Sequence, residues 1–321
     1  MRRVGSFTFI LGLVLFAVLL RTVDLDASWA ILKSADAFWA FLAFLFLLPE
    51  VFFKALRLKV LCRIFKSRLS FAEGNLIYLS GQPLAAVTPA KLGDIVRVLG
   101  LKRWGGMRLT GAFAVHAADK VYDLLVLGLF AASGLMVVLG QDTHETPALV
   151  ALVGIALGIL AMALFLNPQW MRAYVRPALL ALAPQKLSKQ LRTHGGEFYA
   201  DLLSIFQSFN RVLPPLALSV GAWTTVWLRA WFCALALGIP LSFGRLVLLY
   251  PVVVVIEFIP VTLLGFGTRE AALFLFFASA AISKSALMSF SLLNVLAGPL
   301  FTSLIGIPCA LRLSAHFEEK T

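Results

Sequence analysis

Six long apolar runs dominate this amino-acid sequence and restrict the folds that it can adopt. About 20 apolar residues in a helix cross a hydrocarbon layer of roughly 30 Å, which is the length scale of these runs. The runs are Ser6 to Leu20, Ala37 to Phe53, Leu109 to Leu139, Ala148 to Leu166, Val212 to Leu237 and Ser285 to Leu311. We therefore expect an all-α polytopic integral membrane protein with about six transmembrane helices.

The composition excludes the common soluble classes. Hydrophobic residues make up 60% of the 321 residues and charged residues 14%, whereas a soluble domain is about 45 to 50% apolar and about 25% charged. Three isolated cysteines form neither a disulfide framework nor a C-x-x-C zinc motif. The basic residues that produce the net charge of +12 lie beside apolar runs. We therefore attribute this charge to membrane topology and expect no nucleic-acid partner.

Two further apolar regions, Phe71 to Leu101 and Leu246 to Ala281, are each divided near the middle by proline and glycine. Each arm has roughly 12 to 16 residues, which is too short to cross the hydrocarbon core alone. Each region is therefore expected to form a re-entrant helical hairpin that enters and leaves the membrane on one side.

The two broken regions occur at corresponding places in two halves of the chain. The order helix, broken hairpin, helix occurs over residues 37–140 and again over 212–311, with one span between the units. The second unit is therefore expected to be inverted relative to the first. Interrupted segments at matching positions in two halves are typical of a transporter's binding site. We treat residues 1–321 as a single membrane domain.

The loop charges predict the orientation. Most Lys and Arg residues lie in residues 1–5, 54–73, 91–108 and 167–211 and in the C-terminal tail. Cytoplasmic loops carry the positive excess, so we expect a multi-pass protein of the cell (inner) membrane with its N-terminus in the cytoplasm. No A-x-A-like cleavage site follows the first run, so that run is expected to be retained.

Segment 167–211 is the long polar insertion of the sequence. Its apolar residues recur at near-helical spacing, which predicts a cytoplasmic interfacial amphipathic helix. Gly195 and Gly196 are expected to break that helix.

Eight charged side chains lie at membrane depth in this topology. They are Glu50, Asp119, Lys120, Asp123, Arg229, Glu257, Arg269 and Glu270. Each costs about 2.5 to 3.5 kcal/mol at a helix centre, so they must face protein or water. They mark a substrate pathway or pocket, or they pair with one another to hold helices together.

The densest cluster is His116, Asp119, Lys120 and Asp123, which share one helix face at about 100° per residue. The lysine ammonium opposes a metal ion there, and an ion pair between Lys120 and Asp123 is expected instead. His116 is interpreted as a packing residue, with a proton relay as the alternative.

Gly93 and Gly267 mark points where helices are expected to start after irregular backbone. The N–H groups of such a start, with Arg97 or Arg269, would hold a phosphate. In the alternative, the two arginines pair with the neighbouring Asp94 and Glu270.

A group of basic residues follows the second span. It consists of Lys54, Arg57, Lys59 and Arg63. We expect these side chains to extend to the inner headgroups, with Arg57 the best candidate for an inward role.

Catalytic motifs are absent from the sequence. It contains no G-x-S-x-G, H-E-x-x-H or Walker A pattern, and no polar segment is long enough for a separate soluble domain. We expect a transporter without a metal or cofactor. The alternative is a membrane-embedded enzyme or an accessory subunit of a lipid or lipid-linked sugar pathway.

The motifs resemble those of the lysylphosphatidylglycerol synthase transmembrane-region family, also called flippase-like domain proteins. The resemblance covers essentially all 321 residues and rests on Pro89-x-x-x-Gly93-Asp94-x-x-Arg97, on Lys120 and Asp123, and on Ile259-Pro260, Gly265-x-Gly267 and Arg269-Glu270. Asp94 stands where glutamate is more usual, and Lys120 where arginine is more usual.

The resemblance implies a stand-alone lipid translocase that lacks the aminoacyltransferase domain. The substrate would be an anionic, aminoacylated or polyprenyl-linked lipid or glycolipid, and the partners would be that membrane lipid and either a second copy or a lipid-biosynthesis enzyme. The candidate substrate-binding residues are Arg57, Pro89, Gly93, Asp94, Arg97, Lys120, Asp123, Glu257, Pro260, Gly265, Gly267, Arg269 and Glu270.

Overall fold

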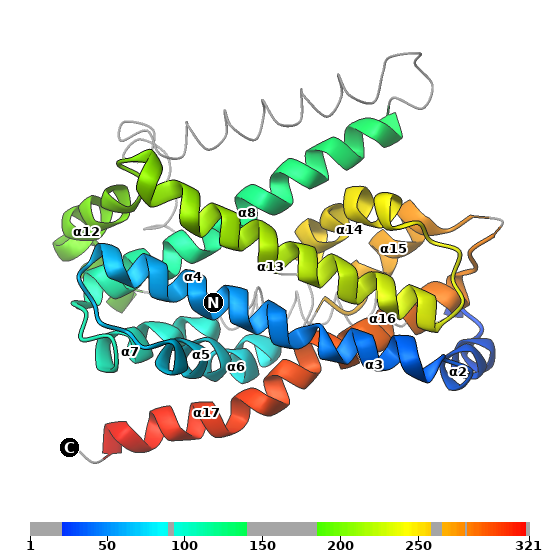
Figure 1. Ribbon diagram of the computed structural model, residues 1–321, viewed down its shortest axis with the longest axis horizontal. Coiled ribbons are helices and arrows are strands. Elements are labelled where there is room, and N and C mark those ends of the chain that lie inside the picture. Colours follow the sequence, from blue (N-terminus) through cyan, green and yellow to red (C-terminus); the bar gives the residue numbers. More distant parts are fainter. Residues whose placement is uncertain (1–20, 89–92, 140–184, 258–264, 280, 319–321) are drawn as a thin grey trace.

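The computed structural model describes residues 21–88, 93–139, 185–257, 265–279 and 281–318, and regular secondary structure in these ranges is entirely helical (Figure 1). The elements are α2 (Leu25–Lys33), α3 (Ala37–Leu45), α4 (Leu47–Ile64), α5 (Phe71–Ser80), α6 (Gln82–Val87), α7 (Val96–Arg103), α8 (Leu109–Leu139), α12 (Gln185–Ile205), α13 (Phe209–Ala236), α14 (Phe243–Glu257), α15 (Thr268–Phe277), α16 (Lys284–Val295), the π-helical turn η4 (Leu296–Leu300) and α17 (Phe301–Glu318).

Long helices form the body of the described structure. Ala37–Ile64, which combines α3 and α4, and Lys284–Ala315, which includes α16 and most of α17, are each long and apolar enough to cross a membrane. α8 and α13 have 31 and 28 residues and thus similar lengths. Two predicted spans, Ser6 to Leu20 and Ala148 to Leu166, lie outside the described residues.

The second predicted span was expected to end near Phe53, and this expectation is wrong. α4 continues to Ile64, so Lys54 lies inside the protein instead of reaching toward headgroups, and Arg57 is buried, as its expected inward role required. Their charges are tolerated because Lys54 pairs with Glu50 of α4 itself, while Arg57 pairs with Asp119 and Asp123 of α8. The break between α3 and α4 falls at Phe46, three residues before Pro49, which has no N–H to donate to the Leu45 carbonyl.

Both broken regions form helical hairpins, and the two hairpins start at opposite ends of the molecule. In Figure 1 α5 and α7 lie toward the left end of the molecule, where α17 also ends, whereas α14 and α15 lie toward the right end. Their inner ends approach each other near the centre, where they line one cavity. Pro89 and Pro260 lie outside the described residues.

Glycines shape the inner ends of the hairpins. A Cβ on Gly93 would lie 2.2 Å from the Leu84 carbonyl oxygen, so only glycine lets the start of α7 pack on α6. Gly265 and Gly267 have φ values of +76° and +91°, which glycine adopts without strain. The Gly267 N–H donates to Glu270 Oε2 at 2.6 Å and thereby caps α15.

α12 runs through Gly195 and Gly196, so the predicted break at these residues is wrong. Two glycines cost about 1 kcal/mol each within a helix. Packing offsets this cost, because α12 lies against α8 and buries Leu202 and Ile205 in the core.

Candidate functional site

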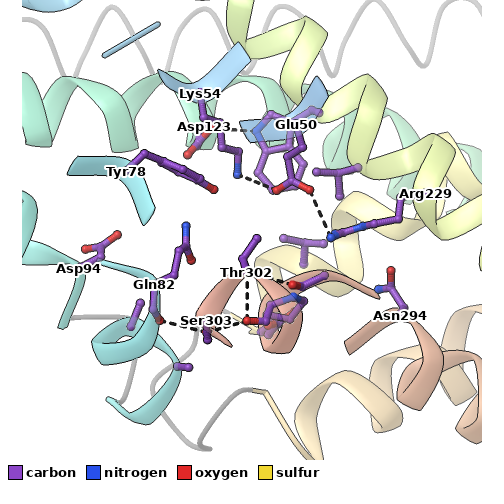
Figure 2. Close-up of a pocket in the computed structure, with 18 of the residues that line it drawn as sticks. Glu50, Lys54, Tyr78, Gln82, Asp94, Asp123, Arg229, Asn294, Thr302 and Ser303 are labelled. Atoms are coloured by element: carbon purple, nitrogen blue, oxygen red, sulfur yellow. Dashed lines mark hydrogen bonds and ion pairs between the residues drawn. The ribbon is translucent and has the colours of Figure 1, made fainter. Parts of the chain in front are cut away.

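A polar cavity of about 140 Å³ lies between the inner ends of the hairpins, with α4, α13, α16 and α17 around it (Figure 2). Four acidic and five basic side chains line it: Glu50, Asp94, Asp123, Glu257, Lys54, Arg97, Lys120, Arg229 and Arg269. Uncharged polar side chains complete the polar lining: Tyr78, Gln82, Tyr250, Asn294, Thr302 and Ser303. Such a cavity inside an apolar helical bundle is suited to a charged or zwitterionic group.

Arg57 ties three helices together behind the wall of the cavity. Its Nε donates to Asp119 Oδ1 at 2.7 Å, and its Nη1 donates to Asp123 Oδ1 at 2.7 Å. Nη1 also donates to Ser219 Oγ on α13. The side chain is fully buried, with a relative exposure of 0%. Arg57 therefore has a structural role, because neither Asp119 nor Asp123 has another guanidinium as close to it.

Asp94 lies in the short turn before α7, and three nitrogen-bearing side chains surround its carboxylate. Lys120 contacts its Oδ2, Arg97 Nη1 lies 3.7 Å from the same atom, and His116 Nε2 lies 3.4 Å from Oδ1. The predicted pair between Lys120 and Asp123 is therefore wrong. Packing of α7 on α8 brings Asp94 to Lys120, while Asp123 accepts hydrogen bonds from Arg57 and from Trp223 Nε1.

Glu50 joins α4 to α13 across the cavity. Its Oε1 lies 3.3 Å from Lys54 Nζ and its Oε2 lies 3.2 Å from Arg229 Nη1, as Figure 2 shows. Gly298, in the π-helical turn, makes room for the guanidinium, since a Cβ there would lie 2.2 Å from Arg229 Nη1. π-helical turns are frequent at functional sites.

Arg269 at the start of α15 forms the last charged cluster. Its Nε lies 3.3 Å from Glu270 Oε1 and donates to Ser291 Oγ at 2.9 Å. Glu257 lies 4.0 Å from its Nη1. The Nη2 atom is buried and makes no hydrogen bond within the described part of the chain. Arg269 therefore retains donor capacity at the cavity.

The model of one protein family, the lysylphosphatidylglycerol synthase transmembrane region, matches residues 4–306. The chain belongs to this family. The lysylphosphatidylglycerol synthase transmembrane-region proteins are membrane domains associated with lipid handling. The all-α fold is thus that of an integral membrane protein, as the sequence predicted. A comparison with curated proteins gave no match.

The structure of this family member places the candidate site residues in three groups. Those that line the cavity are Asp94, Arg97, Lys120, Asp123, Glu257 and Arg269. Arg57 and Glu270 lie behind the wall as ion-pair partners. Gly93, Gly265 and Gly267 set the backbone of the hairpin ends.

Other cavity residues were not among the sequence candidates. Glu50 and Arg229 were recognisable as charges at membrane depth, but their pairing across two helices far apart in the sequence was not. Lys54 was assigned to the headgroup region because the end of its helix was misplaced. Tyr78 and Asn294 give no pattern in the sequence beyond a polar group in an apolar run.

The charged residues of the described structure pair with one another. In the ranges that the structure describes, no group of three His, Cys, Asp or Glu side chains is arranged to hold an ion. The carboxylates meet Arg and Lys instead.

Proposed function

We propose that this protein is a lipid translocase that moves an anionic, aminoacylated or polyprenyl- or glycolipid-type lipid between the two leaflets. The cavity carries this proposal, because it places five basic and four acidic side chains in the interior of an apolar membrane domain. A lipid headgroup that crosses the hydrocarbon layer needs such a polar environment, since a charge without partners there costs several kcal/mol. Arg97 and Arg269 supply bidentate donors for a phosphate.

The arrangement of the hairpins supports the same function. In our proposal both hairpins are re-entrant, one from each face of the membrane, and residues 37–140 and 212–311 form inverted repeats. Transporters built in this way hold substrate between the interrupted helices near the midplane and expose it to each side in turn. The opposite starting points of the hairpins agree with this scheme (Figure 1).

An apolar groove on the outside of the bundle could hold the hydrocarbon chains of the lipid. It is lined by Leu47, Leu48, Pro49, Val51, Phe52, Phe53, Phe71, Asn75, Leu79 and Ile305. These residues lie on α4, α5 and α17, and the same three helices line the polar cavity with their other faces. A lipid that places its headgroup in the cavity would keep its chains in this groove.

Reconstitution in liposomes tests the proposal. We expect the purified protein to move a fluorescent anionic phospholipid or a labelled polyprenyl phosphate to the opposite leaflet, where an added reductant or enzyme detects it. A protein that moves neither lipid but modifies one chemically would instead be a membrane-embedded enzyme.

The proposed topology makes a separate prediction. Ser242 and Ser314 are both exposed; Ser242 directly precedes α14, and Ser314 lies near the C-terminal end of α17. In a Cys309→Ser background, Cys62 and Cys233 stay buried. A membrane-impermeant maleimide should then label Ser242→Cys in intact cells, and Ser314→Cys only after permeabilisation. Labelling of Ser314→Cys in intact cells would refute the inverted arrangement.

A further inference from the structure

The Asp94 carboxylate occupies a position that would suit a substrate phosphate. It lines the cavity, yet it is 3% exposed, because Lys120, Arg97 and His116 approach it from α7 and α8. Proteins bind phosphate with the same kinds of donor, which are ammonium, guanidinium and imidazole groups directed at its oxygens.

Arg97 and Lys120 differ in how tightly the protein holds them. The guanidinium carbon of Arg97 lies 4.5 Å from the centre of the Tyr78 ring, and its Nη1 lies 3.8 Å from Asp119 Oδ2, so its position is set independently of Asp94. The Lys120 side chain is 34% exposed, the largest exposure among the charged groups that contact Asp94. An incoming anion can therefore reach Lys120 without displacing a buried helix.

Asp94 is also the member of the cluster that is best placed to move. It stands in the turn before α7, next to the inner end of the first hairpin, whereas Lys120 and His116 lie within the long helix α8. Arg97 Nε is buried and makes no hydrogen bond within the described structure, so this group has an unused donor beside the cavity.

We infer that Asp94 is an internal counter-anion that holds the phosphate position in the empty protein. The phosphate of a lipid displaces this carboxylate from Lys120 and Arg97. This inference rests on the proposed function and adds that an acid of the site competes with the substrate. The ligand class is an anionic phosphate ester attached to hydrocarbon chains.

The test compares binding of short-chain phosphatidic acid to the purified protein and to variants in detergent, by titration calorimetry. Asp94→Asn removes the competing charge at constant size, so it should bind the lipid about tenfold more tightly than wild type. Lys120→Met should bind it about tenfold more weakly, because the phosphate loses its ammonium partner. Asp201→Asn is the matched control, since it neutralises an acid that pairs with Arg108 and is not part of the cavity lining.

Weaker or unchanged binding by Asp94→Asn would overturn the inference. An equal gain in Asp201→Asn would also overturn it, because the gain would then reflect the net charge of the protein. If Asp94→Asn does not fold, the lipid affinity of Lys120→Met tests the inference instead. An unchanged affinity would mean that Lys120 pairs only with Asp94 and does not bind the phosphate, which would overturn the inference. Inorganic phosphate is titrated in parallel, and a gain for phosphate without a gain for lipid would contradict the lipid assignment. Lipid movement by wild type together with weaker binding by Asp94→Asn would refute this inference while leaving the proposed function intact.

Discussion

Arg57→Ala is expected to lower the free energy of unfolding by about 3 to 5 kcal/mol. The substitution leaves Asp119 and Asp123 buried at 4% and 8% exposure without the guanidinium that joins them. The apparent melting temperature in detergent and the yield of monodisperse protein measure the effect. Arg57→Lys should be intermediate, because an ammonium keeps the charge but cannot reproduce the forked contact.

The matched control for Arg57 is Arg312→Ala, which removes an exposed arginine from α17. This variant should be as stable as wild type. If Arg57→Ala were equally stable, the contacts of Arg57 with α8 and α13 would not contribute to the stability of the fold.

Arg269→Ala is expected to reduce lipid movement about 100-fold or more, because a buried donor of the cavity is lost. The variant also leaves Glu270 without its ion pair, so a loss of folded protein must be separated from a loss of binding. The double variant Arg269→Ala with Glu270→Gln makes this separation. Glutamine is neutral, and its oxygen can still accept the Gly267 N–H that caps α15.

We expect the double variant to recover the yield of folded protein but not lipid movement in liposomes. Arg269→Lys, which keeps a positive charge at the cavity, should fall between wild type and alanine in transport. Recovery of both yield and transport in the double variant would eliminate Arg269 as a substrate ligand.

The helices and helical hairpins of this protein could be predicted from its sequence for simple physical reasons. Long apolar runs such as Leu109 to Leu139 have one stable form in a hydrocarbon layer, which is a helix. The broken regions were recognisable because proline and glycine interrupt their helices near the middle, and Gly267 does start a helix. The limits of α4 and the continuity of α12 were not accessible, because tertiary packing overrides the local cost of charges and glycines.

The charged site was only partly predictable. A charge inside an apolar run must have a partner, which is why Asp119 and Arg229 could be selected from the sequence. The identity of that partner depends on how helices from distant parts of the chain cross. Helical spacing therefore suggested Lys120 with Asp123, whereas packing of the first hairpin gives Lys120 with Asp94.

The central claim is that lipid headgroups cross the membrane through the cavity between the hairpins. Transport by Ala86→Trp in liposomes tests it most directly, because Ala86 lines the cavity and an indole would fill it. Leu84→Trp, on the same short helix but 43% exposed and outside the cavity lining, controls for the added bulk. We predict lipid movement at the wild-type rate with Leu84→Trp and little movement with Ala86→Trp. Movement at the wild-type rate by folded Ala86→Trp would contradict a path through this cavity.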